Sequence, residues 1–360
     1  MSRPQAVPVD SGLDPRARAA ADRYLAAAAA LTDRSGWGLK MFTGLNLFLW
    51  HLDAFARGDD PVPLFVDAFD KASALLEAGG GVSGGHYPAA DAPQIDESAF
   101  EDQVSGLFSD IWVGMTDDIY FDQSYDFTRE RFEKNGLDPE AFFGGRVVLD
   151  AGCGSGKFSA AIARFGAAKV IGMDIGDKGL EFARKQAAKV DYGDRLDYRH
   201  GSLLDIPLDD GAVDIVWSNG VIHHTVGYET CIQEFARVLK PGGKLFLYVN
   251  GRFGLFELLL DTLRVANEGV PRGLFQHFLT LLGVNAGRIY WIMDCLNAPY
   301  EWKSRAEVEA LLIKHGFDDP RQLTRGVATD QIEQVTMGIP YAAVKYGEAQ
   351  LKFIATRRQP

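Results

Sequence analysis

Residues 146–250 alternate short β-branched runs with helical stretches, and this alternation restricts the possible folds more than any other feature of the chain. Alternation of this kind is typical of a parallel sheet that carries helices on both faces. Strands are predicted at 147–150, 169–174, 195–200, 213–218, 244–249 and 351–356, and helices at 157–165, 178–190 and 304–315. We therefore expect an α/β protein.

The segments outside this alternation are predicted to be mostly helical. Alanine-rich sequence and apolar residues at helical spacing fill most of the first 92 residues, and a glycine-rich linker, GGGVSGGHYPAADAP, follows at 79–93. The expected organisation is an N-terminal helical appendage (1–92), a lid with lead-in helices (93–145), a sheet core (146–250), a helical cap insertion (251–303), and a final helix with strands (304–360).

The composition excludes several classes of partner. Lys and Arg total 37 against 49 Asp and Glu, and the net charge of −12 opposes binding to a phosphate backbone. No apolar run approaches the roughly 20 residues of a membrane-spanning helix, and acidic residues interrupt the N-terminal region where a secretory signal would lie. We expect a cytoplasmic protein with neither a nucleic-acid nor a membrane partner.

The three cysteines are too few for a disulfide framework or a Cys-rich zinc site, and no metal is expected. Cys153 lies between two glycines, but no neighbouring His or cation in the sequence would activate its thiolate. We expect it to be a small packing residue.

The stretch VVLDAGCGSGKF, residues 147–158, joins the first strand to the first helix through Gly152, Gly154 and Gly156. Glycine permits left-handed dihedrals and lets a ligand approach the bare backbone. A dinucleotide fingerprint would need its third glycine where Lys157 stands, and a Walker motif would need Ser or Thr where Phe158 stands. The loop therefore predicts a ligand site of another kind.

Four further motifs follow the glycine loop in order. Asp174 ends the second strand in VIGMDI, and GSLLDIP, VDIVWSNG and LKPGGKL follow at 201–207, 213–220 and 239–245. This ordered set resembles the class I S-adenosylmethionine-dependent methyltransferases over about 146–250. The resemblance implies a Rossmann-like seven-stranded sheet, here with an N-terminal helical extension and a helical insertion after the fifth strand. It also implies S-adenosyl-L-methionine as the cofactor.

The resemblance assigns roles to residues at the carboxyl edge of that sheet. The loop with Asp150, Gly152, Gly154 and Gly156 would face the methionine part of the cofactor. Asp174 would hold the ribose, and Ile175 would pack on the adenine. The remaining cofactor contacts would be Ser202 and Leu203 at the adenine edge and Asn219 near the methionine.

Two histidines and two tyrosines are the candidate catalytic residues. His223 and His224, in SNGVIHHT at 218–225, follow the fourth strand, and either could act as general base, with His224 preferred, or serve as local scaffolding. Tyr120 and Tyr125 lie in the segment before the first strand. They could face the sulfonium through cation–π attraction, or they could be ordinary core residues.

The aromatic stretch at 290–302 within the insertion could form an acceptor pocket or a homodimer interface. Together with the N-terminal residues it could cap the cofactor and enclose a small acceptor. We therefore expect a transferase of secondary metabolism that methylates a small molecule. Two alternatives stay open: an enzyme that cyclises the cofactor to a four-membered-ring amino acid and methylthioadenosine, and a non-catalytic regulatory subunit.

Overall fold

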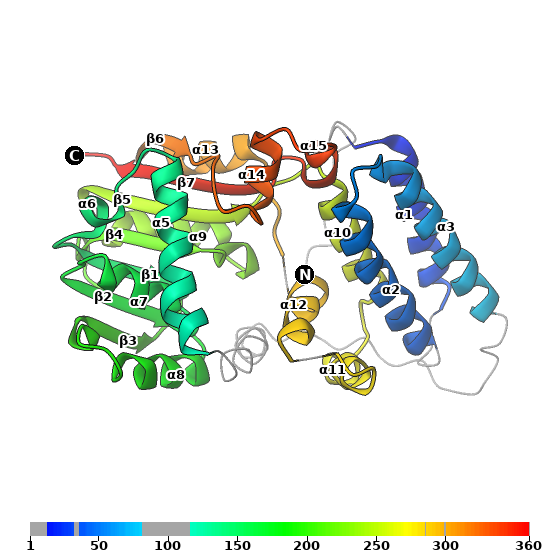
Figure 1. Ribbon diagram of the computed structural model, residues 1–360, viewed down its shortest axis with the longest axis horizontal. Helices are drawn as coiled ribbons and strands as arrows, with labels where there is room; N and C mark the ends of the chain where they lie inside the picture. Colours follow the sequence, from blue (N-terminus) through cyan, green and yellow to red (C-terminus); the bar gives the residue numbers. More distant parts are fainter. Residues whose placement is uncertain (1–12, 32–35, 81–115, 285, 299, 360) are drawn as a thin grey trace. The chain divides into compact units, whose positions relative to one another are not determined.

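The computed structural model describes residues 13–31, 36–80, 116–284, 286–298 and 300–359 (Figure 1). Positions 81–93 of the predicted linker and the lid residues up to 115 lie outside the described residues. The described helices and strands fall into two compact units, one that holds the sheet and one that is helical.

The sheet unit contains seven strands in the order β3-β2-β1-β4-β5-β7-β6 (Figure 1). Strands β1 to β5 are parallel, and β7 is antiparallel to both of its neighbours. This arrangement confirms the predicted seven-stranded fold. The strands are β1 (Val147–Ala151), β2 (Lys169–Asp174), β3 (Leu196–His200), β4 (Val213–Asn219), β5 (Leu239–Asn250), β6 (Phe317–Gln322) and β7 (Gln350–Arg357).

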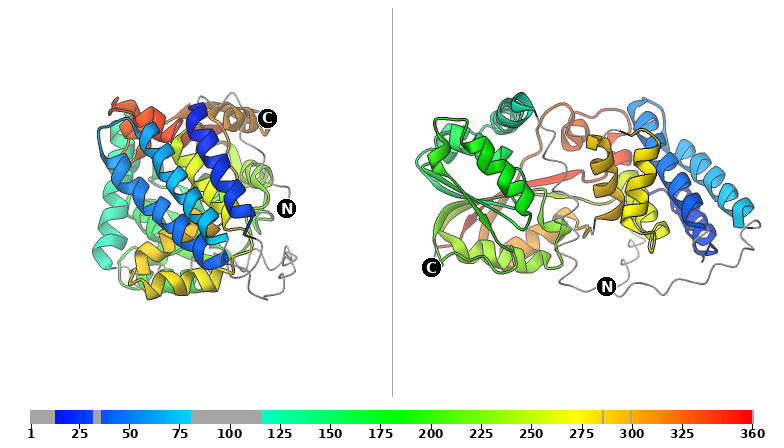
Figure 2. Two further views of the ribbon diagram at one scale, coloured as in Figure 1. Left: turned by 90° about the vertical axis from the view of Figure 1, so that its right-hand side faces the viewer. Right: turned by 90° about the horizontal axis from the view of Figure 1, so that it is seen from below.

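Helices cover both faces of this sheet (Figure 2). On one face, α5 (Ser124–Lys134), α6 (Pro139–Phe143) and α7 (Lys157–Arg164) pack against a layer of aromatic side chains. Within that layer Trp217 of β4 stacks on Phe246 of β5 with ring centroids 3.8 Å apart. Burial of each such side chain contributes about 1.5–3 kcal/mol to the stability of the folded state.

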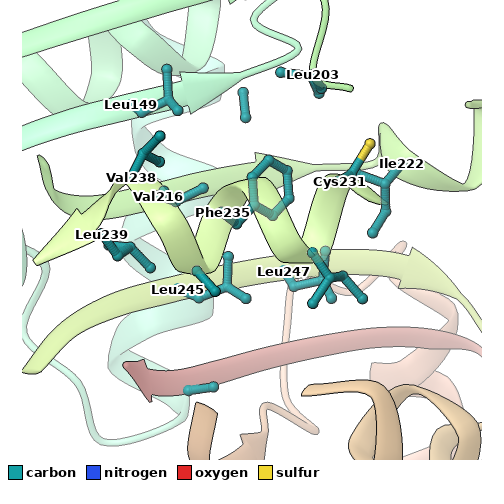
Figure 3. Close-up of a cluster of buried hydrophobic side chains, with 14 of the residues drawn as sticks. Leu149, Leu203, Val216, Ile222, Cys231, Phe235, Val238, Leu239, Leu245 and Leu247 are labelled. Carbon is teal, nitrogen blue, oxygen red and sulfur yellow. The ribbon is translucent and has the colours of Figure 1, made fainter. Parts of the chain in front are cut away.

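The opposite face packs against α9 (Tyr228–Val238) and α13 (Arg305–Lys314), whose apolar residues meet those of the central strands (Figure 3). Adjacent residues of a strand point to opposite faces, so Val148 joins the aromatic layer while Leu149 joins the layer under α9. The hydrophobic core is therefore continuous on both sides of β1. Helix α8 (Asp177–Ala187) packs beside β3 through Leu180 and Ala183.

Strand β6 was not predicted from the sequence. Its residues, FDDPRQ, include three charged side chains and a proline, and it pairs only with β7 at the edge of the sheet. The pairing register shifts between Asp318 and Arg321, and Asp319 has φ +48°. A bulged edge strand tolerates proline and charge, so its sequence lacks the alternating pattern of a buried strand.

The helical unit combines segments that are far apart in the chain. It contains α1 (Pro15–Ala29), α2 (Gly36–Ala56), α3 (Pro61–Gly80), α10 (Leu255–Ala266), α11 (Arg272–Leu281), α12 (Ala286–Asn297) and α15 (Ala342–Tyr346). Helix α1 packs against both α3 and α10, so the N-terminal helices and the insertion share one unit. No helix among the described residues is long and apolar enough to cross a membrane.

Candidate cofactor site at the carboxyl edge of the sheet

The glycine loop connects β1 to α7 and is shaped by contacts that only glycine permits. Gly152 has φ +79°, and a Cβ there would lie 2.3 Å from Cγ1 of Val221. Gly156 has φ +78°, and a Cβ there would lie 2.5 Å from the Tyr198 hydroxyl. A side chain at either position would clash with these neighbours and strain the backbone, which explains why both residues are glycine.

Asp150 lies in β1 just before the loop and is 2% exposed. The hydroxyl of Ser159 in α7 donates to its Oδ2 at 2.6 Å. Burial raises the pKa of Asp150 to about 7, and this hydrogen bond opposes part of the shift. A buried carboxyl that titrates near neutrality is a group whose charge a bound cation would stabilise.

Asp174 is the last residue of β2 and accepts a hydrogen bond from the glycine loop. Its Oδ2 accepts from the Gly154 amide at 2.8 Å, and its Oδ1 accepts from the Gly176 amide at 2.8 Å. Burial raises the pKa of Asp174, while these amides oppose the shift. A carboxylate has about four acceptor positions, so each oxygen can accept one further hydrogen bond. The half-buried Ile175 follows directly.

The remaining predicted contacts lie after β3 and β4. The Ser202 hydroxyl accepts from the Leu204 amide at 3.2 Å, and Asn219 ends β4. Leu203 is 6% exposed, and its side chain belongs to the core cluster between the sheet and α9 (Figure 3). Any ligand contact of Leu203 would therefore come from its backbone. Strand β4 pairs with β1, β1 with β2, and β2 with β3, each in parallel. The carboxyl ends of these four strands therefore lie at one edge of the sheet.

The two histidines form a short 3₁₀ turn (Ile222–His224) after β4 and meet the chain where it returns from the insertion. Ring centroids of His223 and Tyr300 are 4.6 Å apart, and those of His224 and Tyr300 are 4.7 Å apart with perpendicular planes. The Glu301 amide donates to the His223 carbonyl at 2.8 Å. Trp302 continues the cluster, with its ring 4.5 Å from that of Tyr300. An imidazole and aromatic cluster therefore lies beside the carboxyl end of β4.

The structure does not bring Tyr125 to this edge. Its ring stacks on Phe165 at 4.3 Å, and the Arg164 guanidinium lies 4.0 Å from the ring centroid. Both partners come at the end of α7, whose eight residues lead roughly 12 Å away from the glycine loop. The expected lid contact of Tyr125 is thereby corrected, because its place beside Phe165 separates it from the loop.

Tyr120 packs against α8. It is fully buried, and its ring meets Phe182 of α8 edge-on at 5.8 Å. The sequence analysis missed Tyr198 of β3, whose hydroxyl donates to the Gly156 carbonyl at 3.3 Å. The Tyr198 ring packs over Gly172 of the neighbouring strand β2, where an added Cβ would lie 2.6 Å from the ring. A large aromatic residue in one strand and a glycine in the strand before it are the sequence signal for this contact.

Cys153 is buried under the loop, where burial raises the pKa of its thiol well above the ordinary value. A thiol in such surroundings is a poor nucleophile, which agrees with the expected packing role. A hollow of about 500 Å³ lies at the opposite end of β3 and α8, lined by residues such as Arg184 and Asp194. Tyr198 also lines that hollow, but none of the site residues predicted from the sequence does.

Comparison with known proteins gives a consistent result. Residues 149–247 match the model of a methyltransferase domain. The chain is 34% identical over 130 residues to 27-O-demethylrifamycin SV methyltransferase of Amycolatopsis mediterranei (strain S699), covering 35% of this chain and 47% of the relative. It is 35% identical over 141 residues to malonyl-[acyl-carrier protein] O-methyltransferase of Yersinia pestis, covering 38% and 49%.

The chain thus spans about half the length of each of these two relatives. Among solved structures, the [4+2]-cyclase SpnF matches with a TM-score of 0.45 and 16% identity, covering 75% of this chain and 100% of that one. The matched domain contains the glycine loop and the ends of the first, second and fourth strands. Residues 149–247 therefore form a methyltransferase domain, similar to that of S-adenosylmethionine-dependent methyltransferases.

Proposed function

We propose that the protein transfers a methyl group from S-adenosylmethionine to a small-molecule acceptor. The observation that carries this proposal is the meeting of three features at one edge of the sheet. These features are the bare glycine loop, the carboxyl groups of the buried Asp150 and the half-buried Asp174, and the cluster of His223, His224 and Tyr300.

The loop and its carboxyl groups fit this cofactor. A Cβ at Gly152 would lie 2.3 Å from Cγ1 of Val221, so the loop can pass this side chain only as bare backbone. Asp174 keeps acceptor capacity for two ribose hydroxyls while it holds the Gly154 amide. Asp150 places a carboxyl of near-neutral pKa beside a ligand that carries positive charge.

The histidine cluster supplies the proton acceptor. When bound, S-adenosylmethionine supplies a methyl group that is activated by attachment to a sulfonium. The glycine loop and Asp174 would hold the cofactor so that this methyl group lies in line with the acceptor oxygen. His224, held edge-on against Tyr300, would take the proton of the acceptor hydroxyl.

Charge and chemistry favour a small acceptor in a reducing compartment. The net charge of −12 disfavours a nucleic acid, and the aromatic rings of Tyr300 and Trp302 suit a partly apolar molecule. Cys153, Cys231 and Cys295 are all buried free thiols, which is consistent with a cytoplasmic protein. A homodimer stays a prediction, and light scattering of the purified protein tests it.

The test is incubation of the protein with S-adenosylmethionine and a panel of hydroxylated small molecules, followed by mass spectrometry of the products. S-adenosylhomocysteine should form only when an acceptor is present. The variant His224→Gln should lower kcat at neutral pH while the cofactor Kd stays within twofold of wild type. The matched control is His315→Gln, because His315 pairs with Glu229 between α13 and α9 and is none of the residues assigned to the site.

Two other products would overturn the proposal. Methylthioadenosine formed without any acceptor would establish cyclisation of the cofactor. Tight binding of S-adenosylhomocysteine with turnover only after addition of a second protein would establish a regulatory subunit.

A further inference from the structure

The short turn that carries His223 and His224 follows directly on Val221, whose backbone helps to fix it. The Val221 carbonyl accepts from the His224 amide at 2.9 Å, and this bond closes the turn. The preceding Gly220 has φ +80°, and its amide donates to the Tyr248 carbonyl of β5 at 3.0 Å. The position of Val221 therefore determines where the backbone of His224 lies at the end of β4.

The side chain of Val221 packs against the glycine loop. A Cβ at Gly152 would lie 2.3 Å from Cγ1 of Val221, 2.6 Å from Cγ2 and 3.0 Å from Cβ. The bare backbone of Gly152 thus contacts both branches of this side chain. Val221 is half-buried and also packs on the core cluster between the sheet and α9, where close packing restricts its movement. One residue thereby joins the glycine loop to the histidine turn.

The glycine loop has anchors of its own that do not involve Val221. The amides of Gly152 and Cys153 both donate to the Met173 carbonyl of β2, at 2.8 and 3.0 Å. The Asp174 carboxylate accepts from a third loop amide at 2.8 Å. Because these bonds fix the loop to β2, loss of the Val221 side chain should disturb the histidine turn more than the loop.

A second contact holds the turn at the segment that follows the helical insertion. The Glu301 amide donates to the His223 carbonyl at 2.8 Å, and the Tyr300 ring lies against both imidazoles. These contacts orient the rings, but the contact of Val221 with Gly152 is the one that relates the turn to the loop. Displacing a catalytic group by about 1 Å can cost roughly a hundredfold in rate.

We propose that Val221 is a positioning residue, which uses its contact with Gly152 to hold His224 at the distance from the cofactor that proton removal from the acceptor requires. The conformation of the cofactor loop and the position of His224 are then linked through one side chain. This inference rests on the proposed function, which makes His224 the proton acceptor and the loop part of the cofactor site.

Steady-state kinetics of Val221→Ala test this role. With cofactor and acceptor saturating, kcat should fall roughly ten- to hundredfold, while calorimetry should give a Kd for S-adenosylhomocysteine within about threefold of wild type. Val221→Thr keeps both γ atoms, so its kcat should stay within about threefold of wild type. In the His224→Gln background, Val221→Ala should lower kcat no further, because Val221 acts only through His224.

Val147→Ala is the matched control for lost packing. Val147 is a half-buried valine that packs on the same core cluster from the start of β1, and its replacement should leave kcat unchanged. An equal loss of kcat in Val147→Ala and Val221→Ala would overturn the positioning role, as would a full additional loss when Val221→Ala is combined with His224→Gln.

NMR of the histidine side chains gives a readout that does not depend on turnover. S-adenosylhomocysteine should shift the imidazole signals of His224, which are assigned by their disappearance in His224→Gln. The shift in saturated Val221→Ala should be clearly smaller than in saturated wild type, and equal shifts in the two proteins would overturn the positioning role. Failure of wild type to bind S-adenosylhomocysteine would instead overturn the proposed function.

Discussion

Replacing Asp150 by Asn should remove a pH dependence near neutrality from both stability and cofactor binding. The carboxyl is 2% exposed, and burial raises its pKa to about 7. An Asn side chain keeps an oxygen that can accept the hydrogen bond from Ser159, but it has no proton to lose. The variant Asp150→Asn therefore isolates the effect of the charge.

The expected stability change follows from the direction of the pKa shift. The reference value for Asp is 3.8, so between about pH 4 and pH 7 the native state holds a proton that the unfolded chain releases. This stabilisation is complete below about pH 4 and is lost as the pH rises to about 7. Three pKa units correspond to roughly 4 kcal/mol. In urea denaturation, wild type should lose about this much unfolding free energy relative to Asp150→Asn between pH 4 and pH 8.

Cofactor affinity should change in the opposite direction, because an ionised carboxylate attracts the cationic ligand. With a pKa of about 7 for Asp150, the ionised fraction rises from about a tenth at pH 6 to about nine tenths at pH 8. Calorimetry at constant ionic strength should show about a tenfold rise in the affinity of wild type for S-adenosylmethionine over this range. Asp150→Asn should show no such rise. An equal pH dependence in the variant would mean that another group titrates and that Asp150 is not the charge the cofactor meets.

Three further substitutions have definite expected outcomes. Asp174→Ala should weaken S-adenosylmethionine roughly 30- to 150-fold, since about 2–3 kcal/mol of hydrogen bonding is lost, and unchanged affinity in calorimetry would refute the ribose assignment. Gly152→Ala places a Cβ 2.3 Å from Val221 at φ +79° and should abolish cofactor binding, so a variant that still binds S-adenosylmethionine would contradict the role given to the glycine loop. Asp330→Ala leaves Lys352, 2% exposed, without the carboxylate that it contacts at 2.5 Å. It should cost about 3–5 kcal/mol of unfolding free energy, and a loss below about 1 kcal/mol in denaturation would show the pair to be dispensable.

The alternation of residue types predicted most of the sheet, because burial on both faces leaves a continuous apolar run in each central strand. It did not predict β6, where Pro320 and the flanking charges are tolerated at an edge that pairs on one side. It also did not show that α1 packs on α10, since helical spacing reveals an apolar face but not the helix that covers it.

The sequence motifs predicted the part of the candidate site that lies at the strand ends. Asp150 and Asp174 could be named because strand ends in a parallel sheet meet at one edge. Tyr125 could not be placed, because its stacking on Phe165 depends on how α5 crosses α7. The contact of Tyr198 with Gly156 was equally invisible, since it joins residues 42 positions apart through a side chain.

A crystal structure of the protein with S-adenosylhomocysteine would show where the cofactor binds. We predict that the ribose hydroxyls lie within hydrogen-bonding distance of the Asp174 carboxylate, and that the homocysteine chain follows the backbone from Gly152 to Gly156. A ligand bound elsewhere, with Asp174 and the glycine loop bare, would contradict the assignment of this edge of the sheet as the cofactor site.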